Sequence, residues 1–183
     1  DVYPRLLSRE AKAGRLEFIR EMKETIRLLG NHPSIAAWVI FNEGWGQFQT
    51  EDMTRIVRRL DPNRLIDQAS GWFDQGGGDF SSLHNYFFKL FIRPERERAS
   101  VLSEFGGYSY REPGHCAKEK LYGYGICKNK KDLEKRFLER WSGVRNLIPQ
   151  GLSASIYTQW TDVEEEVNGV FTYDREVRKI EPF

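Results

Sequence analysis

Residues 32–43 read HPSIAAWVIFNE, and they indicate the fold more clearly than any other part of the chain. The run from Ile35 to Phe41 is short, wholly apolar and rich in Trp, Val, Ile and Phe, which predicts a β-strand buried on both faces. A turn cluster of Asn, His, Pro and Ser precedes the run, and the polar residues Asn42 and Glu43 follow it. Strands that are apolar along their whole length are typical of parallel sheets covered by helices.

Amphipathic helices are predicted on both sides of this strand. Apolar residues recur at helical spacing from Arg9 to Leu29, with Ser8 as the expected N-cap and Gly30 as the expected stop. The same spacing predicts helices over Thr50–Leu60 and Asp132–Ile148. The strand at residues 35–41 therefore lies between two helices in the sequence.

Four more strands are predicted, at Arg64–Ala69, Ser81–Tyr86, Ala99–Ser103 and Leu152–Trp160. The dipeptide Asn168-Gly169 predicts the turn of a hairpin between the flanking segments VEEEV and VFTY. Strands that alternate with helices imply parallel βα units, which form either an open doubly wound sheet or a closed eight-stranded barrel. Polar residues follow several strands, and in a barrel those positions form the face on which sites are built. An open sheet would instead place its site in one crevice.

Composition narrows the function classes. The chain has 183 residues with 28 Lys and Arg and 27 Asp and Glu, so its net charge of +1 gives no indication of a nucleic-acid partner. Its apolar runs are shorter than a membrane span of about 18 residues, and its charged first residues predict no signal peptide within the chain. Two cysteines, Cys116 and Cys127, make neither a disulfide framework nor a metal motif. The glycine run at 76–78 lacks the residues of a phosphate loop and is expected to be flexible, and no cofactor or metal is expected.

Two carboxylates occupy similar positions in the predicted sheet. Glu43 ends the first strand and is followed by Gly-Trp-Gly, whereas Glu104 follows Val-Leu-Ser and precedes Phe-Gly-Gly. A single Glu after a strand is usually a solvated loop residue. Two of them on parallel strand ends suggest a carboxylate pair across a cleft, which is what cleavage of a glycosidic bond requires.

Three segments carry a resemblance to glycoside hydrolase family 2, the family of β-galactosidases, β-glucuronidases and β-mannosidases. The stretch HPSIAAWVIFNE (32–43) resembles the segment of the acid/base residue, and VLSEFGG (101–107) resembles the nucleophile strand. The stretch YTQWTDVE (157–164), continued to Asn168-Gly169, resembles the eighth barrel strand and the loop that follows it. The three segments occur in the order that they have in the family.

The resemblance implies an α/β fold, the (β/α)8 TIM barrel, and a retaining double displacement. On the matching positions Glu43 would be the general acid/base, Glu104 the nucleophile, and Asn42 a ligand of the sugar 2-hydroxyl. The resemblance further implies that Tyr86 orients Glu104 and that His84 contacts the sugar. Trp160, after the last strand, would stack on a sugar face.

Simpler roles for three of these residues stay open. Tyr86 could be a core tyrosine, His84 a structural histidine, and Trp160 a packing residue of the barrel rim. The expected substrates are β-galactosides, with β-glucuronidase or β-mannosidase specificity as alternatives. A non-catalytic carbohydrate-binding relative of the same fold and an unrelated open-sheet enzyme are further alternatives.

The position of Glu43 in the family's order implies that residues 1–183 are the C-terminal portion of a catalytic barrel, strands four to eight. The first three βα units and the β-sandwich domains that precede the barrel in the family would be absent, since a complete barrel needs about 250 residues. An unclosed barrel exposes strand edges, so we expect self-association and doubtful activity of this chain alone. The expected partner is a carbohydrate substrate, without nucleic acid or membrane.

Overall fold

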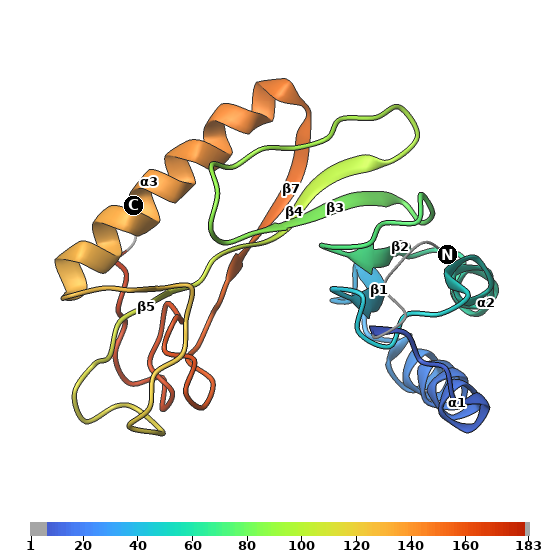
Figure 1. Ribbon diagram of the computed structural model, residues 1–183, viewed down its shortest axis with the longest axis horizontal. Coiled ribbons are helices and arrows are strands. Elements are labelled where there is room, and N and C mark those ends of the chain that lie inside the picture. Colours follow the sequence, from blue (N-terminus) through green and yellow to red (C-terminus); the bar gives the residue numbers. More distant parts are fainter. Residues whose placement is uncertain (1–6, 182–183) are drawn as a thin grey trace. The chain divides into compact units, whose positions relative to one another are not determined.

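The computed structural model describes residues 7–181 and shows an α/β chain (Figure 1). The described residues form two compact units: 7–83 with 93–101, and 84–92 with 102–181. Two long strands contribute to both units, because their first residues belong to the first unit and their last residues to the second. All five strands expected from the sequence are present, with ends that differ by a few residues.

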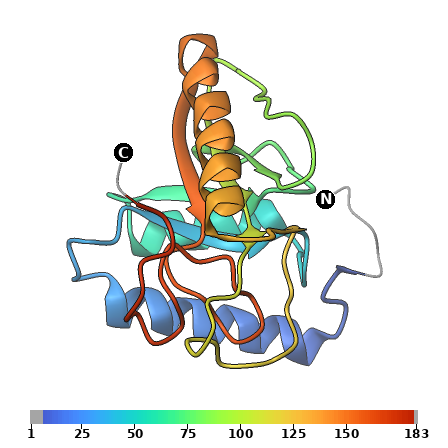
Figure 2. The same ribbon diagram turned by 90° about the vertical axis from the view of Figure 1, so that its left-hand side faces the viewer.

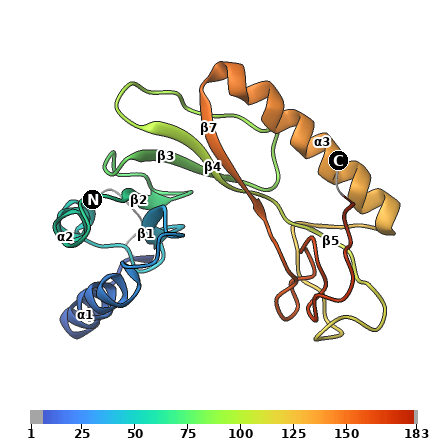
Figure 3. The ribbon, with the colours of Figure 1, turned by 180° about the vertical axis from the view of Figure 1, so that it is seen from behind.

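The first unit contains two paired parallel strands and two helices that pack against them. Strands β1 (Ala37–Asn42) and β2 (Leu65–Ser70) are in register from Ala37 opposite Leu65 to Asn42 opposite Ser70. Helices α1 (Lys12–Leu29) and α2 (Thr50–Leu60) lie beside this pair (Figure 3). Their apolar stripes pack against the strands in two clusters, which include Ile26, Val57 and Ile66 in one and Phe41, Phe48 and Met53 in the other.

The burial of strand β1 differs from the prediction. The apolar run predicted burial on both faces, but Val39 is 57% exposed and only Phe41 of this strand is fully buried. The reason is pairing: within residues 7–181, β1 has β2 as its one strand neighbour. The side chains of Trp38 and Ile40 pack under the helices, whereas Val39 remains accessible at the open edge.

The end of α1 agrees with the sequence and its start does not. The N-cap is Ala11, which makes no side-chain hydrogen bond, so the expected cap Ser8 lies outside the helix. Gly30 is the C-cap, and its N–H donates to the Ile26 carbonyl. Helix α3 (Lys130–Leu147) begins two residues earlier than predicted, where the Asn129 side chain accepts a hydrogen bond from the Asp132 amide.

The main sheet of the chain has the order β3-β4-β7. Its strands are β3 (Phe80–Asn85), β4 (Ala99–Gly106) and β7 (Leu152–Thr158). In the second unit, α3 runs beside β7, to which it is joined by the short 3-10 helix Ile148–Gln150 (Figure 2). A small parallel pair, β5 (Tyr108–Ser109) and β6 (Gly125–Ile126), follows the end of β4.

Aromatic rings fill the space between α3 and the sheet. Phe137 and Trp141 of α3 stack at 6.2 Å, and Trp141 stacks on Phe105 of β4 at 6.1 Å. Tyr157 of β7 meets Phe137 edge-on at 4.9 Å. Gly106 has a φ of 96°, and a Cβ there would lie 2.2 Å from the Tyr157 ring, so this close approach of strand and ring requires glycine.

The predicted hairpin around Asn168-Gly169 is wrong. The tight turn lies earlier, where Val163 and Glu166 exchange both backbone hydrogen bonds. Asn168 is fully buried and accepts a hydrogen bond from the Gln159 side chain at 2.6 Å. The Gly169 amide donates to Asp162 at 2.8 Å. This dipeptide therefore packs against the segment after β7 rather than turning the chain.

The glycine run at 76–78 is more constrained than expected. The Gly77 amide donates to the Gln68 side chain at 3.1 Å, and the Gly77 carbonyl accepts from Arg98 at 3.1 Å. A Cβ on Gly77 would lie 2.2 Å from the Gln68 side chain, so the loop closes directly over β2. No helix in the described part of the chain is both long enough and apolar enough to cross a bilayer.

Candidate active site

Glu43 stands at the turn that ends β1. Its φ is 55°, in the left-handed region that few residues other than glycine adopt. The Glu43 amide donates to the Ser70 carbonyl at 2.9 Å, and the Trp45 amide donates back to the Asn42 carbonyl at 3.0 Å. The Glu43 side chain is partly exposed, and Asn42 beside it is exposed. This turn belongs to the first unit.

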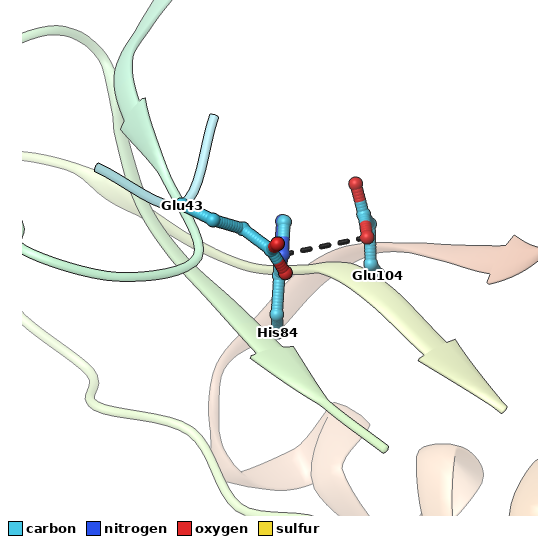
Figure 4. A group of neighbouring side chains, drawn as sticks. All are labelled: Glu43, His84 and Glu104. Carbon is cyan, nitrogen blue, oxygen red and sulfur yellow. Dashed lines mark ion pairs between the residues drawn. The ribbon is translucent and has the colours of Figure 1, made fainter. Parts of the chain in front are cut away.

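Glu104 lies near the C-terminal end of β4, in the second unit. Its side chain is 31% exposed, and its Oε2 atom accepts a hydrogen bond from the Tyr86 hydroxyl. The Nδ1 atom of His84, from β3, lies 3.4 Å from the same Oε2 atom. The dashed line in Figure 4 marks this contact between His84 and Glu104. The structure thus brings together three of the residues that the sequence indicated: His84, Tyr86 and Glu104.

Tyr86 is 5% exposed, and the Glu104 carboxylate is the acceptor of its hydroxyl. Burial raises the pKa of Tyr86, and the hydrogen bond to Glu104 raises it further, because the phenolate would be desolvated beside a negative charge. The hydroxyl therefore stays protonated and remains a donor to Glu104. Its oxygen also lies 3.2 Å from the Thr158 hydroxyl at the end of β7.

Two residues that sequence reasoning missed hold Tyr86 in place. Arg140 of α3 donates to the carbonyls of Tyr86 at 2.7 Å and Phe88 at 2.6 Å, and to the Tyr108 hydroxyl at 2.7 Å. The ring of Tyr124 stacks on the Tyr86 ring with 3.6 Å between centroids. Neither residue carried a sequence signal, since Arg140 follows the charged pattern of a helix surface and Tyr124 lies in a loop.

Trp160 lies in the segment that follows β7. It is 70% exposed, and its ring packs on Phe171 at 5.0 Å with an interplanar angle of 53°. An exposed indole is available to a ligand, although this contact also fits a packing role on the loop. Asn42 and Trp160, like Glu43, keep the roles that the resemblance gave them as predictions.

One cluster of metal-ligating residue types lies elsewhere in the second unit. His115, Asp174 and Glu176 have one ligand atom each within 4.8 Å of one another. His115 Nδ1 lies 2.8 Å from Asp174 Oδ2 and 3.9 Å from Glu176 Oε2. The hydrogen bond to Asp174 raises the pKa of His115, as expected of an ion pair between two loops.

Solved structures of β-glucuronidases have the same fold as this chain. The Ruminococcus gnavus enzyme in complex with uronic deoxynojirimycin matches with a TM-score of 0.63 at 17% identity, over 94% of this chain and 36% of that one. Another structure of Ruminococcus gnavus β-glucuronidase matches with a TM-score of 0.59 at 16% identity, over 89% of this chain and 33% of that one. Faecalibacterium prausnitzii β-glucuronidase matches with a TM-score of 0.58 at 13% identity, also over 89% and 33%.

The structural likeness shows the fold, whereas the sequence profile shows the family. The chain spans about a third of the length of the solved structures, and at such identities the likeness shows the fold alone. The comparison with curated proteins gives no significant match. The sequence profile described as "Glycosyl hydrolases family 2, TIM barrel domain" matches residues 8–105, from before α1 to Phe105 of β4. Because this match covers more than half of the 183 residues, the chain belongs to glycosyl hydrolase family 2, within the family's TIM barrel domain.

Proposed function

We propose that this protein is a retaining β-glycoside hydrolase, with Glu104 as nucleophile and Glu43 as general acid/base. The observation that carries the proposal is the Glu104 carboxylate at the end of β4, which accepts a hydrogen bond from a buried, protonated tyrosine. A carboxylate held in this way is oriented for attack at carbon. Family membership supplies the reaction class.

The first step forms a covalent intermediate. Both Tyr86 and His84 contact Oε2 of Glu104, so we assign the other oxygen, Oε1, as the attacking atom. Oε1 forms an ester bond to the anomeric carbon while the bond from that carbon to the leaving-group oxygen breaks. The leaving oxygen takes the proton of the Glu43 carboxyl, and Glu43 is left as a carboxylate. Asn42 would hydrogen-bond the 2-hydroxyl of the sugar.

The second step consumes water. The Glu43 carboxylate takes a proton from a water molecule, whose oxygen bonds to the anomeric carbon as the ester bond to Glu104 breaks. The sugar leaves with its original anomeric configuration, and both carboxyl groups return to their starting states. His84 and Trp160 are proposed to contact the sugar ring, the first beside the nucleophile and the second through its exposed indole.

We further propose that residues 1–183 are the C-terminal part of the catalytic barrel. Strands β1, β2, β3, β4 and β7 would be barrel strands four to eight. The parallel pairing of β1 with β2, the order β3-β4-β7 and the alternation with helices support this assignment. The preceding βα units would complete the sugar pocket, so the activity belongs to the longer protein.

The proposed substrates are neutral β-glycosides, with β-galactosides first. The segment 159–171 after β7 contains three consecutive glutamates, 164–166, and no Lys or Arg. Lys118 pairs with Glu164 at 2.9 Å and with Glu165 at 3.5 Å, and Lys179 is fully buried on Asp162. Because Lys118 and Lys179 already pair with carboxylates and the segment itself is acidic, this region would repel the carboxylate of a uronic acid rather than bind it.

Mechanism-based labelling tests the proposal. The full-length protein and the 183-residue chain are incubated with 2-deoxy-2-fluoro derivatives of β-galactosyl, β-glucuronyl and β-mannosyl fluoride, and adducts are located by peptide mapping. We expect a galactosyl adduct on Glu104 in the full-length protein. Glu104→Gln removes the adduct, whereas Glu51→Gln, an exposed carboxylate of α2, leaves it unchanged.

The outcomes separate the alternatives. A glucuronyl or mannosyl adduct on Glu104 would support the proposed mechanism but change the sugar assigned to the substrate. An adduct on a different carboxylate overturns the assignment of the nucleophile. A folded full-length protein that binds these sugars but forms no adduct with any of them supports a non-catalytic carbohydrate-binding relative instead.

A further inference from the structure

The ring of Tyr124 lies flat on the ring of Tyr86. The centroids are 3.6 Å apart and the planes differ by 6°. Phe87 meets Tyr124 edge-on at 5.3 Å, and Tyr122 does so at 5.9 Å. Rings this close are in van der Waals contact across their faces, so the Tyr124 ring blocks tilting of the Tyr86 ring toward it.

The backbone around Tyr124 is built to deliver this contact. The Tyr124 amide donates to the Gly107 carbonyl at 3.1 Å, one residue after β4. The Ser109 hydroxyl donates to the Tyr122 carbonyl at 2.8 Å, and the Cys127 amide donates to the Ser109 carbonyl at 2.7 Å. The segment that carries Tyr124 is therefore hydrogen-bonded along residues 107–109, directly beyond Glu104.

Glycine at position 107 makes room for the stack. Its φ is 66°, and a Cβ there would lie 2.5 Å from Cδ2 of Tyr124 and 3.1 Å from Cδ1 of Tyr86. A side chain at this position would push the two rings apart. The left-handed turn after β4 and the ring stack thus depend on the same residue.

The hydrogen bonds from Arg140 hold the backbone at Tyr86 but do not fix the orientation of its ring. Arg140 donates to the carbonyls of Tyr86 and Phe88, which anchors the main chain to α3. The hydroxyl reaches Glu104 only at certain side-chain torsions, and His84 borders the ring edge-on at 6.5 Å. Tyr124 covers one face of the ring.

We propose that Tyr124 is a positioning residue of the active site, which holds the Tyr86 ring at the angle where its hydroxyl donates to Oε2 of Glu104. The proposal rests on the proposed function, since it assigns Tyr124 to the orientation of the nucleophile. Tyr124 acts through Tyr86 and does not itself touch the reacting atoms.

A double-mutant cycle in the full-length protein tests the proposal. The variants are Tyr124→Leu, Tyr86→Phe and the pair together, with Tyr124→Phe as the matched control that keeps the stacked ring. Phe88→Leu, at a side chain 73% exposed in the same region, controls for loss of an aromatic. The readouts are kcat, KM and the rate of labelling of Glu104 by the fluorinated sugar.

We expect Tyr124→Leu to lower kcat and the labelling rate by about tenfold, a factor that corresponds to about 1.4 kcal/mol, with little change in KM. Tyr124→Phe and Phe88→Leu should behave like wild type. Tyr86→Phe already lacks the hydroxyl, so adding Tyr124→Leu to it should change kcat by less than about twofold. Full additivity of the two substitutions would overturn the proposal.

A spectroscopic readout keeps the test independent of activity. Fluorotyrosine is introduced at position 86, and its fluorine resonance is recorded in each Tyr124 background. The resonance should shift and broaden in Tyr124→Leu and stay in place in Tyr124→Phe, while Tyr124→His, with a smaller flat ring, should be intermediate. An unchanged resonance in Tyr124→Leu, with the protein folded, overturns the proposal.

Failure of the proposed function gives a different pattern. A folded wild-type protein that neither turns over nor is labelled by any sugar overturns the hydrolase proposal and the positioning role with it. A wild-type protein that is active, with Tyr124→Leu fully active although the fluorine resonance has shifted, overturns the positioning role alone.

Discussion

Glu43 has a backbone conformation that is uncommon for a residue with a side chain. Its φ of 55° is followed by a φ of 80° at Gly44, and its amide is bonded to the Ser70 carbonyl of the neighbouring strand. A Cβ on Gly44 would lie 2.4 Å from the Phe73 ring, so the turn is enclosed on that side too. Strained backbone fixed by its surroundings is concentrated at functional sites, which makes the Glu43 side chain the first target for substitution.

Glu43→Gln keeps the side-chain volume and removes the proton that the proposed mechanism transfers. We expect kcat/KM of the full-length protein to fall by about 10²–10⁴-fold on alkyl β-glycosides, the usual contribution of general acid–base catalysis. Dinitrophenyl β-glycosides need no protonation of the leaving group, so the loss on their glycosylation step should be much smaller. Steady-state kinetics on both substrate classes measures the difference. Equal losses on the two classes would contradict the role of Glu43.

Residue-level roles were only partly predictable from the sequence. Glu43 and Glu104 lie in segments that resemble the family, whereas Tyr86 was selected from its position at the end of a predicted strand. Arg140 and Tyr124 were not selected, because what they do depends on contacts with Tyr86, which lies 54 and 38 positions away from them in the chain. A pattern of helical or loop residues carries no information about such distant partners.

At the scale of elements, Arg98 joins the loops on either side of β3. Its guanidinium donates to Asp74 at 2.7 Å and Glu95 at 2.7 Å, and to the carbonyls of Gly77 and Phe80, both at 3.1 Å. The Arg98 side chain is 8% exposed, although it ends the run RPERER (93–98), whose mixed charges are typical of a solvated segment. Burial is the largest single influence on Asp74 and would raise its pKa, but the hydrogen bonds from Arg98 and the Gly76 amide, together with the charges of Arg98 and Arg93, outweigh it and lower that pKa.

Arg98→Met should destabilise the protein by about 2 kcal/mol, because it leaves two carboxylates and two carbonyls without their charged donor. The loss of stability is no larger because both carboxylates, of Asp74 and Glu95, are partly exposed and screened by solvent. Urea denaturation should show a lower midpoint with an unchanged slope. Arg96→Met, at an exposed arginine of the same run, is the matched control and should shift the midpoint little. Equal shifts in the two variants would show that Arg98 has no special role.

Elements were predictable where one local signal decided them. The apolar run at 35–41 located β1, four further strands lie where the sequence predicted them, and helical periodicity placed α2 from Thr50 to Leu60, as observed. The hairpin predicted at Asn168-Gly169 was wrong, because an Asn-Gly pair suits a hairpin turn and equally suits a tightly packed, buried segment. Which of the two occurs is decided by Gln159 and Asp162, which the local pattern does not include.

The ion pair of His115 with Asp174 joins two loops of the second unit and should make stability depend on pH. The hydrogen bond to Asp174 raises the pKa of His115 above 6.5, and bonds from Thr172 and His115 lower the pKa of Asp174 from 3.8 to about 2. The histidine contribution is complete below its ordinary pKa and is lost as the pH rises through the raised value. The aspartate contribution is present above 3.8 and is lost as the pH falls towards 2.

Thermal denaturation of wild type and His115→Gln across pH tests this dependence. The difference in Tm between them should be largest from about pH 4 to pH 6.5 and should shrink on both sides of that window. Glu176, at 3.9 Å from His115, adds a weaker attraction with the same sign. His32→Gln, at an exposed histidine, is the matched control. A difference that stayed constant with pH would mean that the pair contributes packing and not charge.

At the scale of the whole molecule, each unit leaves a strand edge open. Within residues 7–181, β1 pairs with β2 alone and β7 pairs with β4 alone. Val39 of β1 is 57% exposed and Ile156 of β7 is 59% exposed. An apolar groove lined by Phe18 and Met22 lies beside β1. Unpaired edges with apolar side chains are templates for pairing with another chain, which is the physical basis of the expected self-association.

Self-association of the 183-residue chain should therefore proceed through these edges and respond to charge placed on them. We expect sedimentation velocity to show species larger than the monomer, increasing with concentration, and a shift toward monomer when Val39→Lys and Ile156→Lys are combined, because lysine on an edge strand opposes pairing. Leu138→Lys, at a side chain of α3 that is 50% exposed, makes the same change of polarity away from any strand and should leave the distribution unchanged. A monomer at every concentration would contradict the expectation outright, and equal dispersal by Leu138→Lys would assign the contact to general surface apolarity. If only the strand variants act, the surfaces that pair are the same edges at which the proposed barrel would accept its neighbouring strands.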